Sequence, residues 1–237
     1  MNDVDDQQHS LAWFRSRLGM ITGSAVGNIM KASRTKGEVF GDTALAYLRQ
    51  LAAERMMNPA VVADDELFSQ YIDSVDVSSR TMRFGSDMEQ YARDLFVKTT
   101  GFTVRQVGSA RHDTIPDFAA SPDGLIYNGD DRVSAVLEIK CPKQSTFIQY
   151  AATVHDAPSL RQANPMYFWQ TLAEMMCIDV PLCYFCVYCP WQSSPLHTAR
   201  SRRDTEAEEQ LTERVLLADE YIEQLISDIK QNGTTAA

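Results

Sequence analysis

Two carboxylates and one ammonium group occur within a short, otherwise apolar stretch, SPDGLIYNGDDRVSAVLEIKCP at 121–142. Asp123 lies between a proline and a glycine at the bend before one expected strand, and Glu138 and Lys140 are two residues apart on the next. Residues two apart on a strand point to the same face, so Ile139 turns to the core. If the two strands pair, the three charges converge. Such charges would be costly to bury singly, which indicates a site.

This convergence would supply the donor types that a divalent cation needs. The carboxylates of Asp123 and Glu138 and the main-chain carbonyl of Ile139 are hard oxygen ligands of the kind that Mg²⁺ prefers. Lys140 cannot bind a metal, but it can orient or help deprotonate a water, or stabilise charge on a phosphate oxygen. Together these groups could hydrolyse a phosphodiester. The simpler alternative is an exposed Glu138–Lys140 salt bridge with Asp123 capping a turn.

The hydrophobic periodicity predicts the elements that would position these residues. Helices are expected over 10–19, 24–31, 43–57, 79–101, 145–154, 164–178 and 205–230. Strands are expected over 102–112, 117–124, 124–128, 132–140, 181–191 and a further segment up to 203. Residues 60–79 are acidic and ambiguous. The order predicts an α/β fold with a mixed central β-sheet flanked by helices.

We expect one domain over residues 1–237. A helical N-terminal part would cover 1–80, a catalytic core 81–203, and a C-terminal helix and tail 204–237.

The bulk composition is typical of a globular protein. Hydrophobic residues make up 44% of the chain and charged residues 23%, and no run of about 18 apolar residues could span a bilayer. The acidic N-terminus is unlike a signal peptide, and five cysteines, an odd number, suit a reducing compartment. We therefore expect a cytoplasmic protein with no membrane association.

A net charge of −10 argues weakly against nucleic acid, because phosphate affinity comes mostly from Lys and Arg. For DNA binding, local clusters of basic residues matter more than the net charge of the whole chain. One cluster, in the loop after the second expected helix, favours DNA contact: Lys31, Arg34 and Lys36. The other fits DNA contact or a solvated strand end equally well: Arg200, Arg202 and Arg203.

Four motifs follow one another along the chain, and two of them contain the charged residues described above. They are W-x-x-x-R-x-G-x-I-T-x-S at 13–24, G-x-x-x-E at 85–89, S-P-D-G at 121–124 and L-E-I-K-C-P at 137–142. In this combination the chain resembles the phage lambda exonuclease family, the YqaJ-type viral recombinase branch of the PD-(D/E)xK nucleases. The resemblance runs from about 13 to 190 and implies a restriction-endonuclease-like core with an N-terminal helical region.

The resemblance implies roles for the charged residues. It implies that Asp123, Glu138 and the Ile139 carbonyl bind metal, that Lys140 is the catalytic lysine, and that Glu89 is an additional active-site acid. The cofactor it implies is Mg²⁺, with Mn²⁺ as a substitute.

The resemblance also implies a pocket for the 5′-phosphate of a DNA end, formed by Arg17, Ser24 and Ser121. A guanidinium is a planar fork suited to phosphate. Gln170 and Tyr167 match a family Y-x-x-Q-x-Q segment that would support the site, although a leucine replaces its second glutamine here.

The implied activity is 5′-to-3′ digestion of one strand of double-stranded DNA from 5′-phosphorylated ends, leaving 3′ single-stranded overhangs for phage-type recombination. The implied partners are double-stranded DNA ends, two further copies in a homotrimeric ring, and a single-strand annealing protein in the bacterial host. The alternatives are an endonuclease or repair nuclease on the same core, or a catalytically inert DNA-end-binding or recombinase-loading module.

Two further signals remain open. Cys183, Cys186 and Cys189, with Cys141 as a fourth ligand, could hold an iron–sulfur cluster, although a spacing of three on a strand sends neighbouring cysteines to opposite faces. Residues 60–79 fall where a duplex-splitting wedge would lie in the family, with Leu67 and Phe68 as its apolar candidates.

Overall fold

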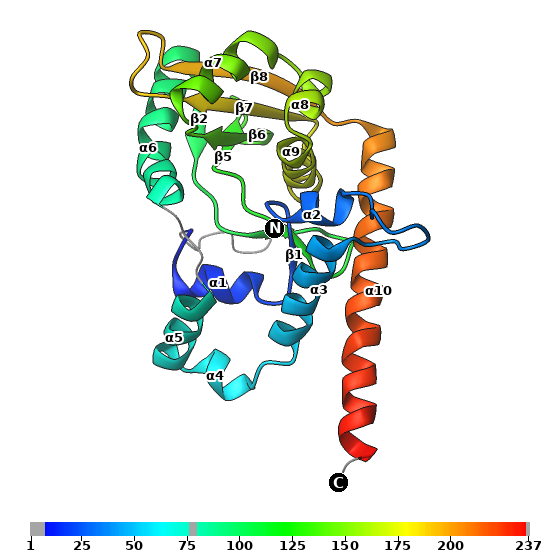
Figure 1. Cartoon of the computed structure of the whole chain (residues 1–237). Helices are drawn as coiled ribbons and strands as arrows, with labels where there is room; N and C mark the ends of the chain where they lie inside the picture. The colour runs from blue at the N-terminus through cyan, green and yellow to red at the C-terminus, as the bar shows by residue number, and fades with distance from the viewer. Residues whose placement is uncertain (1–7, 76–79, 236–237) are drawn as a thin grey trace.

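The computed structural model describes residues 8–75 and 80–235, which form two β-sheets surrounded by helices (Figure 1). The predicted α/β class with a mixed sheet flanked by helices is confirmed. The strands are β1 (Ile21–Thr22), β2 (Thr103–Arg105), β3 (Ala110–Arg111), β4 (Phe118–Ala120), β5 (Gly124–Tyr127), β6 (Val133–Lys140), β7 (Leu182–Tyr188) and β8 (Leu196–Arg202). The larger sheet has the order β2-β5-β6-β7-β8 and the smaller one β1-β4-β3.

The division into two sheets corrects the expectation of continuous strands over 102–112 and 117–124. The first segment splits into β2 and β3, and the second gives β4, which lies in the smaller sheet, before β5 starts in the larger. Pro122 has no N–H to donate to a ladder, so pairing stops there. Ile21–Thr22, which follows the first helix, was not predicted as a strand and pairs parallel to β4.

Most of the predicted helices are confirmed to within a few residues. The helices are α1 (Leu11–Arg17), α2 (Val26–Met30), α3 (Asp42–Arg55), α4 (Pro59–Ala63), α5 (Asp65–Val75), α6 (Arg80–Thr100), α7 (Gln144–Thr153), α8 (Ala157–Ala163), α9 (Pro165–Ile178) and α10 (Thr205–Thr235). The ambiguous segment 60–79 is helical as far as Val75, and 76–79 lie outside the described residues. The expected loop before α9 contains α8, which a capping box between Asp156 and Ser159 begins.

Helices cover both faces of the larger sheet. Val136 on β6 packs into a core shared with Phe168 and Leu172 of α9. Its neighbour Leu137 points the other way, into a second core with Phe96 of α6. This alternation places every second residue of β6 on the α9 face, which decides where the polar residues at the end of this strand point.

The contact between α2 and α9 is unusually close. A Cβ added at Gly27 would lie 2.5 Å from the Sδ of Met166 and 3.1 Å from its Cα. The missing side chain of Gly27 therefore sets how near α9 lies to the N-terminal part of the chain.

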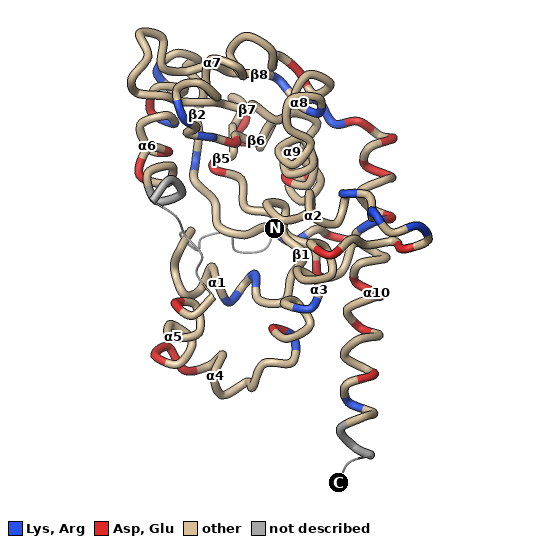
Figure 2. Tube along the Cα trace, viewed as in Figure 1, with Lys and Arg blue, Asp and Glu red and all other residues tan. Residues whose placement is uncertain are grey.

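The long helix α10 packs an apolar stripe against the core that contains Val136 and Phe168, and it carries acidic residues on its exposed side (Figures 1 and 2). Acidic residues also gather on α5, whereas Lys and Arg mark the loop after α2 (Figure 2). Across the described residues, no helix combines the length and apolar character that crossing a bilayer would require.

The side chain of His112 stabilises the turn between β3 and β4, because its unprotonated Nδ1 accepts hydrogen bonds from the backbone. Its Nδ1 accepts from the backbone N–H groups of Thr114 and Ile115 at 3.2 and 3.1 Å, and its ring stacks on Phe118. Burial lowers the pKa of His112, so the folded state disfavours the imidazolium.

We predict that this histidine makes stability depend on pH. Its contribution is present above an unfolded pKa of about 6.5 and is lost as the pH falls below that value. His112→Asn keeps an acceptor but does not titrate, so the fall in unfolding free energy between pH 7.5 and 5.5 should be smaller in the variant. Urea unfolding at both pH values measures this. The exposed His155→Asn is the control, and an equal fall in wild type and His112→Asn would contradict the prediction.

Candidate active site

The antiparallel pairing of β5 with β6 brings the two predicted metal ligands together. Gly124 pairs with Leu137, so Asp123 stands opposite Glu138. The Oδ2 atom of Asp123 accepts from the backbone N–H of Ile139 at 2.7 Å. Both carboxylates are withdrawn from solvent, with Asp123 9% and Glu138 1% exposed.

Lys140 and the two predicted support residues surround the Glu138 carboxylate. The Nζ of Lys140 lies 2.5 Å from Oε1 of Glu138, and the Nε2 of Gln170 donates to the same oxygen at 2.6 Å. The ammonium also lies 5.0 Å from the ring centroid of Tyr167. The salt bridge that was the simpler alternative does exist, but at a buried carboxylate and not on an exposed strand.

The remaining oxygen of this carboxylate has no protein partner. Oε2 of Glu138 is buried without a hydrogen bond, and so is Oε2 of Glu174 on α9. Buried polar atoms are normally satisfied, so each exception calls for an explanation, and an absent ion is one.

The acidic groups repel one another. Burial and the charges of Glu138 and Glu89 raise the pKa of Asp123, and burial together with Glu138 raises the pKa of Glu89 to about 7. Glu89, on α6, therefore lies within electrostatic reach of the pair. Although burial opposes it, the charges of Glu138 and Asp123 raise the pKa of Lys140. A cation bound among these carboxylates would relieve the repulsion.

The residues present fit a hard divalent cation. Among the described residues no three His, Cys, Asp or Glu side chains form a ready metal cluster, so an ion here would depend on a main-chain oxygen as well as on side chains. Asp123, Glu138 with its unpartnered Oε2, and the Ile139 carbonyl form such a set.

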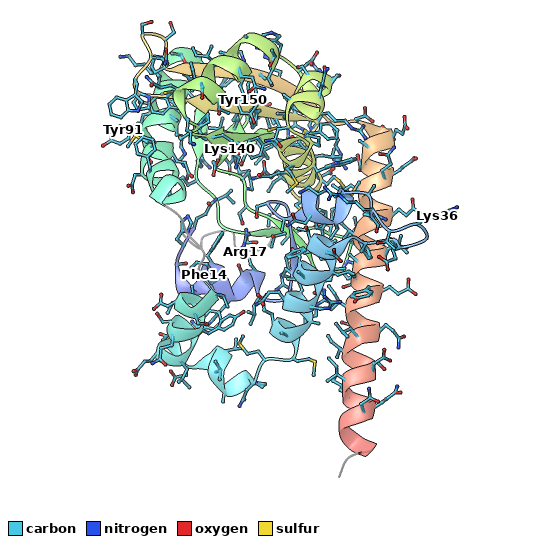
Figure 3. All side chains as sticks on the ribbon, in the orientation of Figure 1. Phe14, Arg17, Lys36, Tyr91, Lys140 and Tyr150 are labelled. Carbon is cyan, nitrogen blue, oxygen red and sulfur yellow. The ribbon has the colours of Figure 1, made fainter. Side chains whose placement is uncertain are left out.

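Arg17 reaches both of the serines that were predicted to share its pocket. Its Nη1 donates to Oγ of Ser121 at 2.7 Å and its Nη2 to Oγ of Ser24 at 3.4 Å. The guanidinium lies 4.2 Å from the ring of Trp13, whose Nε1 also donates to Ser121, at 3.2 Å. In Figure 3, Arg17 lies on the side of α1 that faces the sheet carrying Lys140.

This guanidinium has no counterion in the described part of the chain. None of the ion pairs found there includes Arg17. Burial lowers the pKa of Arg17 to about 10. A partly desolvated cation with neutral partners alone is suited to an anionic ligand.

Parallel pairing of β1 with β4 explains why two serines so far apart in sequence meet. Thr22 is level with Ala119, so the same register continued by two residues brings Ser24 level with Ser121. The expectation that Ser24 begins a helix was wrong, because α2 starts at Val26 without a side-chain cap. Ser24 instead accepts from Arg17.

The sequence did not reveal two of the residues that support the site. Glu174 accepts from Nε2 of Gln170 at 3.0 Å and is 1% exposed. Its spacing of four from Gln170 on an otherwise apolar helix was the available signal. Arg93 of α6 donates to the backbone carbonyl of Asp123 at 3.1 Å, a contact that nothing in the local sequence indicates.

The alternative of a cysteine-bound cluster finds no support. Cys183 faces the α9 core and Cys186 the α6 core, so the two thiols lie on opposite faces of β7. Among the described residues, no three His, Cys, Asp or Glu side chains lie close enough to hold a metal ion, and all five cysteines are free thiols.

The candidate wedge residues differ from each other. Leu67 is 46% exposed, whereas Phe68 is fully buried beneath the guanidinium of Arg15. As placed here, Phe68 is part of the packing between α1 and α5 and is not available to split a duplex.

The two basic clusters also differ. Arg203 pairs with Asp179 and Glu208, which occupies its guanidinium within the protein. Lys31 and Arg34 line a surface cavity of about 350 Å³ beside the start of α3. That cavity includes none of the predicted catalytic residues.

Comparisons with known proteins identify the family and the fold. Residues 12–180 match the YqaJ-like viral recombinase domain. The alkaline exonuclease LHK-Exo of Laribacter hongkongensis has a similar structure, with a TM-score of 0.76 and 25% identity over 96% of this chain and 100% of that one.

Two further structures are similar. LHK-Exo in complex with dAMP matches over the same shares of the chains, with a TM-score of 0.76 and 26% identity. A phage-related exonuclease of Haemophilus somnus 129PT, at 17% identity, shares the fold with a TM-score of 0.62 over 89% of this chain and 96% of that one. A search of curated proteins gave no significant match.

We predict that Gln170 stabilises the fold through the two carboxylates that it bridges. Gln170→Leu leaves Glu138 and Glu174 without this buried donor, which should lower the unfolding free energy by about 2 kcal/mol. Urea unfolding in the absence of divalent cations measures the loss. Gln149→Leu, at an exposed position on α7, should change the free energy by less than about 0.5 kcal/mol. Equal stability of the two variants would contradict the role given to Gln170.

Proposed function

The chain belongs to the YqaJ-like viral recombinase domain family, and from this premise we propose that it is a DNA exonuclease. It would digest one strand of double-stranded DNA in the 5′-to-3′ direction from 5′-phosphorylated ends and leave 3′ overhangs. Its likeness to an alkaline exonuclease supports DNA hydrolysis as the class of reaction.

One observation carries the proposal. Arg17 donates to Ser121, and Ser121 stands two residues before Asp123. A span of two residues is at most about 7 Å. A pocket suited to a terminal phosphate is therefore joined by a short, sheet-anchored piece of chain to the carboxylates suited to cleavage. An enzyme that cuts at the end of a strand needs this proximity.

The metal would be Mg²⁺, held by Asp123, Glu138 and the Ile139 carbonyl. When bound, it would supply Lewis-acid polarisation of the scissile phosphate and activation of a water. Lys140, anchored on Glu138, would orient the attacking water or stabilise charge on a phosphate oxygen. Gln170 would keep Glu138 in place by holding one of its oxygens while the other stays free.

The reaction we propose breaks the bond from phosphorus to the 3′-oxygen of the terminal nucleotide. The water oxygen joins phosphorus, and the departing 3′-oxygen takes up a proton. The next nucleotide then carries the 5′-phosphate that Arg17 binds in turn. Repeated cycles would produce the overhang used in recombination, with a homotrimeric ring around DNA and a single-strand annealing protein as the proposed partners.

A single assay separates this proposal from its alternatives. Linear duplexes with 5′-phosphate or 5′-hydroxyl ends and a closed circular duplex are incubated with Mg²⁺ or with EDTA. We expect Mg²⁺-dependent loss of 5′-phosphorylated linear DNA alone. Cutting of closed circles would favour an endonuclease, and intact DNA with protein bound at its ends would favour an inert end-binding module.

We predict that Asp123→Asn abolishes cutting and spares binding. Loss of a ligand charge should remove about 3 kcal/mol or more of transition-state stabilisation, which is a rate loss of more than about a hundredfold. Nuclease assays measure the rate, and a DNA-end shift assay in Ca²⁺ measures binding. The exposed Asp73→Asn on α5 is the control. Turnover retained in Asp123→Asn would refute the assigned role.

We predict that Arg17→Ala weakens the preference for phosphorylated ends. A hydrogen bond to a charged group contributes about 1.5–3 kcal/mol, so kcat/KM on 5′-phosphate ends should fall about tenfold to a hundredfold. The fall on 5′-hydroxyl ends should be smaller. Paired kinetics on the two substrates test this. If the variant keeps the wild-type ratio, the phosphate pocket lies elsewhere.

A further inference from the structure

The turn that carries Arg17 is held by the last turn of α3. Oε2 of Glu54 accepts from the backbone N–H of Gly19 at 2.8 Å, and Nε of Arg55 donates to the Gly19 carbonyl at 2.9 Å. Gly19 has φ +71°, and a Cβ there would lie 2.7 Å from Cγ of Arg55. Both backbone groups of a residue two positions after Arg17 are thus fixed by side chains of another helix.

The holding residues are themselves anchored. Arg55 pairs with Asp219 and Glu223 of α10, each at 2.8 Å. Oε1 of Glu54 accepts from Tyr71 of α5 at 3.1 Å. The turn at Gly19 is therefore linked through Arg55 to α10 and through Glu54 to α5.

Tyr47 fixes the other end of this turn. Its hydroxyl accepts from the backbone N–H of Thr22 on β1 at 3.0 Å. Burial raises the pKa of Tyr47, and the positive charge of Arg17 opposes that rise. Thr22 stands two residues before Ser24, the second serine that Arg17 contacts.

We propose that Tyr47, Glu54 and Arg55 are positioning residues that set the preference for a 5′-phosphate end, because they hold the segment from Arg17 to Ser24 against α3. The inference rests on the proposed function. A long arginine side chain loses considerable entropy when it is held in one place. A backbone fixed at Gly19 and at Thr22, between Arg17 and Ser24, keeps the fork aimed at Ser121, so less of that loss remains when phosphate binds.

Tyr47→Phe is the sharpest test, because it removes one oxygen and keeps the ring. A lost neutral hydrogen bond of about 1 kcal/mol corresponds to about fivefold. We expect the ratio of kcat/KM on 5′-phosphate ends to that on 5′-hydroxyl ends to fall about fivefold, mainly through a higher KM on phosphorylated ends. Tyr221→Phe, which removes a hydroxyl from a ring packed on Phe40, is the matched control and should keep the wild-type ratio.

Glu54→Leu is a second, independent test. It removes the acceptor for the Gly19 N–H and should also lower the ratio of kcat/KM on 5′-phosphate ends to that on 5′-hydroxyl ends. A purely structural role would lower kcat/KM equally on both ends and leave the ratio unchanged. A wild-type ratio in both Tyr47→Phe and Glu54→Leu would overturn the inference while leaving the proposed function intact. A wild-type enzyme that does not distinguish the two ends would instead overturn the phosphate pocket itself.

Discussion

The pairing of β5 with β6 is the constraint on which the site depends. It places Asp123 opposite Glu138, and the backbone N–H of Ile139 then holds the Asp123 carboxylate. The alternation of β6 turns Glu138 and Lys140 toward α9, where Gln170 donates to Glu138 and Tyr167 lies beside the Lys140 ammonium. A slip of one residue in this register would send both charges into the apolar core under α6, and that cost makes the register specific.

The charges of the two candidate pockets are not fully paired within the protein. Among the described residues, Arg17 donates to neutral serine hydroxyls, and Lys140 is the only cation that forms an ion pair with the crowded carboxylates of Asp123 and Glu138. Both arrangements violate the rule that buried charges are paired. Such violations are expected where a protein keeps sites ready for ligands of the opposite charge. In the proposed function, the anion pocket at Ser121 and the cation pocket at Asp123 lie two residues apart.

The sequence was sufficient to predict what depends on local pattern. The period of two on β6 predicted that Glu138 and Lys140 share a face, and the helix expected over 10–19 is α1, which the Ser10 side chain caps. The split of the strands between two sheets was not predictable, because it depends on which partner each short segment finds. The hydrogen bond from Gln170 to Glu174 was not predictable either, since the burial of Glu174 follows from the packing of α9. The roles of the site residues remain proposals.

Gly27 has a consequence that reaches beyond packing. It admits Met166 at the start of α9, the helix that carries Gln170, while its own helix follows directly after Ser24. A side chain at this position would crowd Met166 and so disturb the approach of α9, with Gln170, to the segment that carries Ser24, although Gly27 belongs to neither proposed pocket. Any larger residue at this position therefore requires Met166 to move. The evolution of both proposed pockets is therefore constrained by Gly27, a residue that lies in neither of them.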